Sequence, residues 1–350
     1  MNSPLLALAL LCPVAFVPQS QEDETDAHGY DKMRIEQEDK LLVPMEIKDA
    51  VWEYLRTRLT EDKEFLASLD PLFTATWNEE LFHDTYFDTP SLQLHAMQSG
   101  VRHRKRENIT NPDDVKSGRE LMQIKLNDIS SNELERAEIK YDIDRMPKRD
   151  TPEGRHPTLG RVKEEHRKPF KDRLEAIGLD PQSMQPILTV VDVRRRVYLK
   201  KNGNAFMSIS FDQVQCDLLW AHVEFCEIEP ELNEIGFTEA DEATRTYMES
   251  VLAKVVGDIR AKFPEIQQVL TPKYNKSFDR LEAEIPMLRT LVKVGLHDDG
   301  AVLLVFGGVL VVLVVATVPR LLRGKRDKKK GPAPLAGAAP QPRREHSPVA

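Results

Sequence analysis

Charged and polar side chains recur at every second position in six short stretches of this 350-residue chain. The stretches contain, in order, Glu36, Glu38 and Lys40; Arg102, Arg104 and Arg106; Arg136, Glu138 and Lys140; Asp192, Arg194 and Arg196; Ser208, Ser210 and Asp212; and Glu227 and Glu229. Side chains of a strand alternate between faces, so each stretch would direct its polar groups to one side of a sheet. Because unpaired buried charge is very costly, such a face must contact water, ions or a highly charged ligand.

The residue types on this face suit a metal-bound polyphosphate. Arginine binds phosphate oxygens through a fork of two N–H groups, and lysine adds a point charge. The candidate basic groups are Lys40, Arg102, Arg104, Arg106, Lys125, Arg136, Lys140, Arg194 and Arg196. Carboxylates are the hard oxygen ligands that Mg²⁺ and Mn²⁺ require, and the candidate acidic groups are Glu36, Glu38, Glu138, Asp212, Glu227 and Glu229. A second metal, or one carboxylate, could activate water for attack on a terminal phosphorus.

About eight strands would position these groups, with helices before, between and after them. We predict strands over residues 33–43, 83–88, 102–106, 121–126, 134–143, 188–200, 206–214 and 222–229. The pair Asn202-Gly203 is a strong hairpin signal between two of these strands. The pattern predicts an α+β fold: an eight-stranded antiparallel closed β-barrel with flanking helices, whose wet lumen would hold the charged face.

Composition excludes several other classes of function. The formal net charge of −8 argues against general affinity for nucleic acid. The nine histidines are scattered without a metal-binding spacing, and the sequence has neither a P-loop nor a GxGxxG motif. Cys216 and Cys226 should lie on opposite faces of neighbouring strands, which disfavours a disulfide between them.

Two apolar segments predict a membrane-anchored protein. Residues 300–319 carry no charge, are long enough to cross a bilayer, and precede a basic flank that the positive-inside rule places in the cytoplasm. Residues 1–20 contain an apolar run typical of a signal peptide, although a basic start is missing. Together they predict an exported globular domain, one transmembrane helix and a cytoplasmic tail over residues 320–350. The alternative is an uncleaved apolar start on a cytoplasmic, tail-anchored protein.

The ordered set of motifs resembles the CYTH family, the triphosphate tunnel metalloenzymes. Glu36-Gln-Glu38-Asp-Lys40 is similar to the ExExK signature that opens the family, and Tyr86-Phe-Asp88-Thr-Pro90 is similar to its YFDT element. Further similarity lies in the basic strand 101–106, the strand 121–125, the acidic strand 225–229 and the closing element 272–274. Some of these elements also resemble the related VTC domain of polyphosphate polymerases. The match spans residues 33–280, between a linker over 21–32 and a juxtamembrane helix or linker over 281–299.

The resemblance implies a tunnel, a divalent metal (Mg²⁺ or Mn²⁺) and triphosphate-like substrates. Carried over by position, the metal-binding and catalytic residues are Glu36, Glu38, Glu227 and Glu229. The phosphate-binding residues would be Lys40, Arg102, Arg104, Lys125, Arg194, Arg196 and Lys273. Lumen positions with less specific roles are Arg106, Arg136, Glu138, Lys140 and Asp212. For Glu138 and Lys140 the alternative is an ion pair that only stabilises the barrel, and for Arg106 it is a surface position.

The expected function is that of a membrane-anchored, metal-dependent phosphohydrolase acting on tripolyphosphate or nucleoside triphosphates. One alternative is a non-catalytic module that binds polyphosphate or another polyanion. The other is a polyphosphate polymerase related to the VTC domain. The expected partners are the triphosphate or polyphosphate substrate and the membrane, without nucleic acid, and the sequence does not indicate an oligomeric state.

Overall fold

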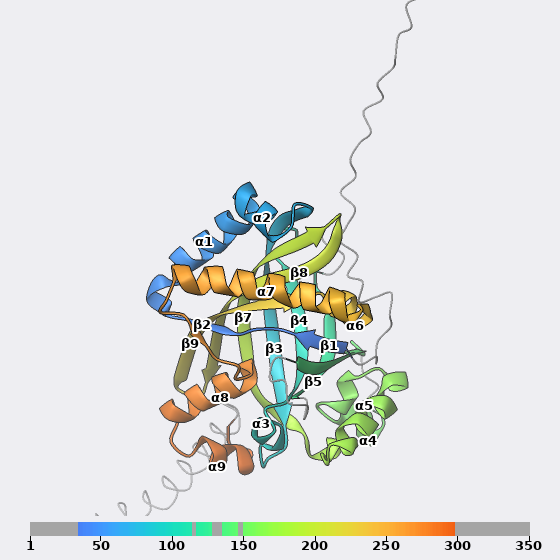
Figure 1. Ribbon diagram of the computed structural model, residues 1–350. Helices are drawn as coiled ribbons and strands as arrows, with labels where there is room; N and C mark the ends of the chain where they lie inside the picture. Colours follow the sequence, from blue (N-terminus) through green and yellow to red (C-terminus); the bar gives the residue numbers. More distant parts are fainter. Residues whose placement is uncertain (1–33, 114–116, 128–134, 146–149, 298–350) are drawn as a thin grey trace, which may run out of the picture. The chain divides into compact units, whose positions relative to one another are not determined.

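The sheet is the feature of the fold that positions the charged residues (Figure 1). The structure is a computed structural model that describes residues 34–297 except 114–116, 128–134 and 146–149; the side chains of residues 34–36, 135 and 136 also lie outside the description. In this part of the chain ten strands form one sheet in the order β1-β6-β5-β4-β3-β7-β8-β9-β2-β10, and the pairings are antiparallel. The strands are β1 (Arg34–Gln37), β2 (Leu41–Val43), β3 (Phe73–Asp88), β4 (Gly100–Asn108), β5 (Glu120–Asn127), β6 (Glu135–Asp142), β7 (Gln185–Lys201), β8 (Asn204–Leu218), β9 (Ala221–Leu232) and β10 (Gln267–Gln268).

Helices precede, interrupt and follow the strands, as the α+β pattern predicts. They are α1 (Lys48–Thr60), α2 (Lys63–Leu69), α3 (Gln93–Ala96), α4 (Pro152–Arg155), α5 (Glu164–Ala176), α6 (Glu234–Glu239), α7 (Glu242–Lys262), α8 (Lys273–Glu284) and α9 (Leu288–Lys293). In Figure 1 the long helix α7 crosses the sheet, while α4 and α5 lie together at one end of the molecule beside β5. Helices α8 and α9 lie together below β9.

The predicted eight-stranded closed barrel is wrong. Over the described residues the sheet has ten strands, and its hydrogen-bonding order ends at β1 on one edge and β10 on the other. The break lies between β1, which pairs with β6, and β2, which pairs with β9. One isolated bridge, Glu38 to Glu231, lies between these two ladders. At Lys40 the backbone N–H instead contacts the Asp39 carboxylate at 2.8 Å and the carbonyl accepts from Val269 at 2.9 Å, so this residue does not continue either ladder.

The strands carry apolar side chains on the outer face and charged ones on the inner face. In β7, Val197 and Leu199 are fully buried beneath the helices α1 and α7, whereas Arg194 and Arg196 point to the opposite side. Over β5 and β6, the helix α5 packs Phe170 against the sheet. The hydrophobic core is therefore outside the sheet, and burial of apolar area there stabilises the fold, while the inner face is left to the charges.

The structure also corrects the predicted membrane organisation. In the part of the chain that the structure describes, no helix is both long and apolar enough to cross a membrane. Residues 300–319 and 1–20, the proposed span and signal peptide, lie outside the described residues. Charge-free length identifies a candidate span in the sequence, but it does not establish a helix there. The single-pass topology and the localisation derived from it are therefore not supported.

Candidate functional site

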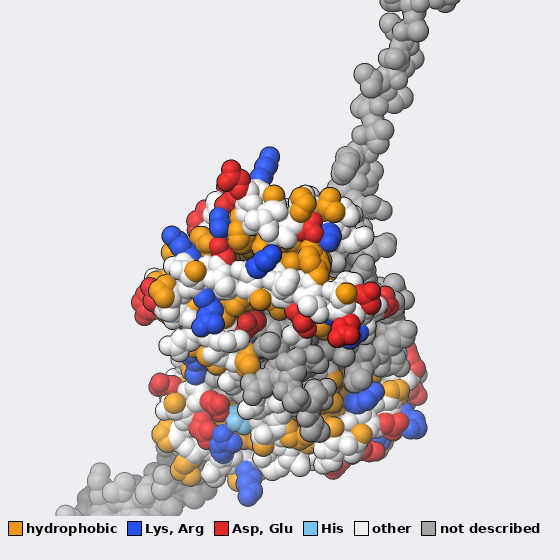
Figure 2. Space-filling view, in the orientation of Figure 1, with side chains coloured by type: hydrophobic (Ala, Val, Ile, Leu, Met, Phe, Trp, Pro, Cys, Tyr) orange, Lys and Arg blue, Asp and Glu red, His pale blue; other side chains and the backbone are white. Residues whose placement is uncertain are grey.

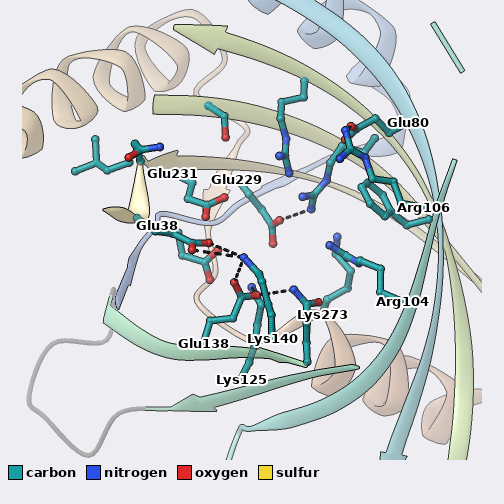
Figure 3. A pocket seen from close by; sticks show the side chains of 18 of the residues that line it. Glu38, Glu80, Arg104, Arg106, Lys125, Glu138, Lys140, Glu229, Glu231 and Lys273 are labelled. Carbon is teal, nitrogen blue, oxygen red and sulfur yellow. Dashed lines mark hydrogen bonds and ion pairs between the residues drawn. The ribbon is translucent and has the colours of Figure 1, made fainter. Parts of the chain in front are cut away.

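The inner face of the sheet encloses a cavity of about 730 Å³ (Figure 3). Six glutamates line it, together with eleven basic residues: Lys40, Arg102, Arg104, Arg106, Arg119, Lys125, Lys140, Arg194, Arg196, Lys200 and Lys273. The formal charge of the lining is thus positive although the whole chain is acidic. By contrast, acidic and basic side chains are interspersed over the face of the molecule in Figure 2. An excess of positive charge in an enclosed site favours an anionic ligand.

Cross-strand register brings the inward side chains into rows. Arg194 of β7 lies opposite Asp212 of β8, which lies opposite Glu227 of β9. The next inward positions give a second row of Arg196, Ser210 and Glu229. Since directly opposed Cβ atoms are about 5 Å apart, these rows make contact across three strands. The polar residues that recur at every second position in the sequence thus form one continuous polar surface across β7, β8 and β9.

A buried aspartate holds two arginines of the opposite wall. Arg104 of β4 donates from Nε and Nη2 to the two carboxylate oxygens of Asp84, at 2.7 and 2.6 Å. Arg102 donates to the same carboxylate at 3.0 Å and to Gln123 Oε1 at 2.7 Å. Burial alone would raise the pKa of Asp84, but Arg102 and Arg104 hold it well below its usual range. The Asp84 carboxylate thus fixes the orientation in which the two guanidinium groups line the cavity.

The carboxylates of Asp192, Asp212, Glu227 and Glu229 form a buried cluster at the cavity wall, together with the cations that pair with them. Ligand atoms of Asp212, Glu227 and Glu229 lie within 4.8 Å of one another. Lys273 Nζ contacts Asp212 at 2.6 Å, Asp192 at 2.7 Å and Glu227 at 3.4 Å. Arg194 lies 2.7 Å from Glu229, Lys276 lies 2.5 Å from Glu227, and Lys40 also pairs with Glu229.

The carboxylates of this cluster differ in how readily they bind a proton. Burial would raise the pKa of Glu229, but Lys40, Lys273 and Arg194 hold it well below its usual range. Burial and the adjacent charge of Asp212 instead raise the pKa of Asp192 to about 6. One carboxylate of the cluster is therefore firmly ionised while another binds a proton near neutral pH.

Lys40 contacts a carboxylate from each of the two predicted acidic segments, 36–38 and 227–229. Its Nζ lies 3.2 Å from Glu38 Oε1 and forms an ion pair with Glu229. Glu36 of the same signature faces Arg136 in the β1–β6 register, but the side chains of this pair lie outside the description. The ExExK segment thus places a cation between two carboxylates that come from opposite ends of the sheet order.

Glu138 and Lys140 form the predicted lumen ion pair, 2.5 Å apart. Lys125 lies 3.4 Å from the same carboxylate, and Gln123 donates to it at 2.8 Å. Burial would raise the pKa of Glu138, but Lys140 and Lys125 hold it well below its usual range. Figure 3 shows Glu138, Lys125 and Lys140 projecting into the cavity beside Glu38, so the pair is part of the site's lining.

The structure brings most of the predicted site residues to one cavity. Its lining includes Glu38, Lys40, Arg102, Arg104, Arg106, Lys125, Glu138, Lys140, Arg194, Arg196, Glu229 and Lys273. Arg106, for which a surface position was the alternative, pairs with buried Glu80 and lines the cavity. Asp212 and Glu227 are fully buried behind the lining.

Several residues of the site were missed in the sequence. They are Glu80, Asp84, Arg119, Gln123, Glu231, Glu234 and Lys276. A signal existed for Glu80 and Asp84, because both share the period-two face of β3 with Tyr86, but Phe82 interrupts the charged pattern. Lys276 follows Lys273 by one helical turn in α8, a period that a search for strand alternation does not find.

The acidic cluster fits a hard divalent cation. Asp212, Glu227 and Glu229 offer only carboxylate oxygens, which are the donors that Mg²⁺ and Mn²⁺ prefer. Among the described residues, Glu227 Oε1 accepts no hydrogen bond even though it is buried, and Lys273 Nζ lies 3.4 Å from it. These three residues are therefore the best candidates to hold a metal, and their oxygen donors suit Mg²⁺ and Mn²⁺ equally.

Residues 54–254 match the CYTH domain. A comparison with curated proteins found no match.

Similar solved structures include a putative adenylate cyclase from Bacillus halodurans, at 15% identity and a TM-score of 0.43, covering 70% of this chain and 98% of that chain. A putative adenylyl cyclase from Hippeastrum, titled as having a dominant triphosphatase activity, has 16% identity, a TM-score of 0.36 and coverage of 65% and 87%. The Mimivirus capping enzyme triphosphatase has 13% identity, a TM-score of 0.32 and coverage of 68% and 94%.

These structural similarities are too low to assign an activity, and the expected relation to the VTC domain is not shown by them. The match to the CYTH domain is stronger evidence than these structural similarities. It covers more than half of the 350 residues and includes the strands β3 to β9, which contribute residues to the cavity. It agrees with the resemblance that the ordered motifs indicate. The chain belongs to the CYTH family.

Proposed function

We propose that this protein is a divalent-metal-dependent phosphohydrolase that cleaves the terminal phosphoanhydride of tripolyphosphate or of a nucleoside triphosphate. The observation that carries the proposal is the cavity in which eleven lysines and arginines face a cluster of carboxylates. Membership of the CYTH family supports the processing of triphosphates in general.

The basic residues would bind and orient the phosphate chain. Arg102 and Arg104 are already oriented by Asp84, so less side-chain entropy is lost when a phosphate binds them. Arg194 is fixed in the same way by Asp212 and Glu229. Such preorganised donors stabilise negative charge that develops on phosphate oxygens during transfer.

The carboxylates would hold the metal and accept a proton. Asp212, Glu227 and Glu229 are the candidate ligands, and a bound divalent cation would supply charge neutralisation at the phosphate oxygens. Glu38, on the cavity wall 3.2 Å from Lys40, is placed to take the proton of the attacking water. The water oxygen forms a bond to the terminal phosphorus, the bridging P–O bond breaks, and orthophosphate leaves with pyrophosphate or a nucleoside diphosphate as the second product.

The test is release of orthophosphate from tripolyphosphate and from ATP with Mg²⁺, with Mn²⁺ and with a chelator. We expect release that requires the metal and that falls about 100-fold or more in Glu38→Gln, because a proton acceptor is lost. The matched control is Glu153→Gln in α4, which removes a partly exposed partner of Lys171. A folded protein that releases no phosphate from any triphosphate would refute the proposal; calorimetric binding of the same anions without turnover would instead favour the polyanion-binding alternative.

A further inference from the structure

The helix α8 occupies one end of the cavity. Strand β3 runs along the cavity from Thr74, which pairs with Lys200, to Asp88. At the Asp88 end, the Tyr274 hydroxyl of α8 donates to the Asp88 carboxylate at 3.0 Å, and Lys273 of the same helix reaches into the acidic cluster. Figure 1 shows α8 at the end of the sheet opposite the β7–β8 hairpin. A linear anion would therefore reach the acidic cluster from the hairpin end.

The hairpin end of the cavity is in contact with solvent. Residues 203–205 of the β7–β8 turn line the cavity and are exposed. Lys200, which precedes the turn in β7, lines the same end and is partly exposed. Its neighbour Lys201 lies on the outer face of the sheet, where its Nζ is 2.9 Å from Asp70. Since side chains of a strand alternate between faces, this contact agrees with an inward direction for Lys200.

Two cations toward this end have no carboxylate partner in the described part of the chain. Arg104 and Arg194 bind carboxylates directly. By contrast, among the described residues no carboxylate oxygen lies within 4.0 Å of the charged nitrogens of Arg196 or Lys200. The Nε of Arg196 donates to the Ser210 hydroxyl at 2.9 Å, which orients the guanidinium group but leaves its charge intact.

The carboxylates of the same region do not cancel this charge. Glu80 pairs with Arg106, and Glu234 pairs with Lys140 at 3.1 Å. Glu231 also lines the cavity, but over the described residues it forms an ion pair with neither of the two cations. Positive charge therefore extends from the acidic cluster toward the solvent at the hairpin, and it favours an anion that follows the same path.

We propose that the cavity takes a linear inorganic polyphosphate of more than three phosphates by its end. The terminal phosphate would lie at the acidic cluster, and later phosphates would lie on Arg196 and Lys200. The inference rests on the proposed function and keeps its reaction. The oxygen of water bonds to the terminal phosphorus, its proton passes to Glu38, and the bridging P–O bond breaks with its electron pair left on the shortened chain, so that orthophosphate is released.

The length of β7 favours a chain longer than a triphosphate. Arg194 lies 2.7 Å from Glu229 of the acidic cluster. Lys200 follows Arg194 by six positions in β7, or about 20 Å along a strand. A tripolyphosphate held at Arg194 ends before Lys200, whereas further phosphates continue along the strand to it. The net charge of −8 disfavours a nucleic acid as the source of those phosphates.

The experiment compares tripolyphosphate with a longer linear polyphosphate of uniform length, using the full-length protein with Mg²⁺. Calorimetry gives Kd per chain, and orthophosphate release gives KM. We expect the longer chain to bind more tightly, and Lys200→Ala to weaken its binding about tenfold while leaving tripolyphosphate unchanged. Lys200→Arg keeps the charge and should keep the preference. The matched control is Lys201→Ala, which removes the same charge from the outer face and should leave the preference between the two anions unchanged.

A cyclic polyphosphate tests the direction of binding on the unmodified protein. A ring has no terminal phosphate, so we expect no orthophosphate release from it under conditions in which the linear chains are hydrolysed. Hydrolysis of the ring at the rate of the linear chain would show that binding by the chain end is not required and would overturn the inference.

The remaining outcomes separate this inference from the proposed function. Equal effects of Lys200→Ala on both linear anions, or no tighter binding of the longer chain, overturn the inference even if tripolyphosphate is hydrolysed. If the longer chain binds preferentially through Lys200 but no phosphate is released, the binding mode stands and the proposed hydrolysis fails. Tighter binding of a 5′-triphosphorylated RNA than of polyphosphate with as many phosphates would assign the hairpin end to nucleic acid and would also overturn it.

Discussion

Replacing Lys273 with methionine should destabilise the fold far more than an exposed lysine would. Lys273 is 6% exposed, and its Nζ lies 2.6, 2.7 and 3.4 Å from carboxylates of Asp212, Asp192 and Glu227, which are fully buried. Methionine preserves most of the side-chain volume but removes the charge. The change therefore isolates the electrostatic role of the lysine from its packing.

The magnitude follows from the burial of the partners. Removing one member of a buried ion pair costs about 3–5 kcal/mol, because the remaining charge stays desolvated. For a domain of this size each kcal/mol lowers Tm by about 2–4 °C, which gives a decrease of about 6–20 °C. The control Lys171→Met breaks a pair with Glu153 whose side chains are 29% and 41% exposed. Exposed pairs contribute about 0–1 kcal/mol, so Tm of the control should fall by no more than about 4 °C.

The assay is thermal denaturation followed by circular dichroism at pH 7.5, with and without Mg²⁺. If the cluster binds divalent cations, Mg²⁺ should raise the Tm of Lys273→Met more than that of the wild type, since the ion replaces the missing charge. A Tm of Lys273→Met within the range of the Lys171→Met control would refute the reasoning. A large decrease that Mg²⁺ leaves unchanged would retain the ion-pair account and contradict the metal site.

Two further perturbations test the described geometry. Burial and the charge of Asp212 raise the pKa of Asp192 from 3.8 in the unfolded chain to about 6 in the native state. The native state therefore binds the Asp192 proton more tightly than the unfolded state does. The stability that this proton contributes is complete below pH 3.8 and is lost as the pH rises through 6. Asp192→Asn should therefore lose less stability than the wild type between pH 4 and 7, by up to about 3 kcal/mol in denaturant titrations; parallel pH profiles would contradict it. Gly160→Ala would place Cβ 2.4 Å from the Gly154 carbonyl oxygen and should cost about 1–3 kcal/mol with KM unchanged, whereas Gly257→Ala on α7, with open space around it, should not destabilise.

The charged face could be predicted from the sequence because strand alternation is a local property. The inward positions 102, 104, 194, 196 and 229 all follow from a period of two, and all line the cavity. The α+β class and the Asn202-Gly203 turn between β7 and β8 were predicted for the same reason. Cys216 and Cys226 are free thiols, as their predicted placement on opposite faces indicated.

Closure of the barrel could not be predicted, because it depends on long-range pairing. The segment 34–43 has a strand pattern throughout, yet its two halves pair with strands about 90 residues apart in sequence, β6 and β9. The interruption at Asp39 and Lys40 depends on the carbonyl of Pro230 and the N–H of Val269. No local pattern marks those contacts.

The surroundings of the site depend on tertiary packing for the same reason. The basic segment 150–168 contains several prolines and glycines, a composition typical of an exposed loop, but Leu159 and Val162 in it are fully buried against β5 and β6. His103 lies between Arg102 and Arg104 in a basic stretch, yet it is only 8% exposed, with Nε2 2.8 Å from Glu120. Composition alone does not show which surface another element covers, so neither burial could be predicted.

The most direct test of a catalytic, metal-binding cavity is the effect of Glu229→Gln on phosphate release in Mg²⁺. Glu229 belongs to the candidate metal cluster and contacts both Lys40 and Arg194. We predict that kcat for the better of ATP and tripolyphosphate falls about 100-fold or more, while calorimetry without metal shows anion binding within about tenfold of the wild type, because the basic residues remain. Unchanged phosphate release by a folded Glu229→Gln protein would contradict the account.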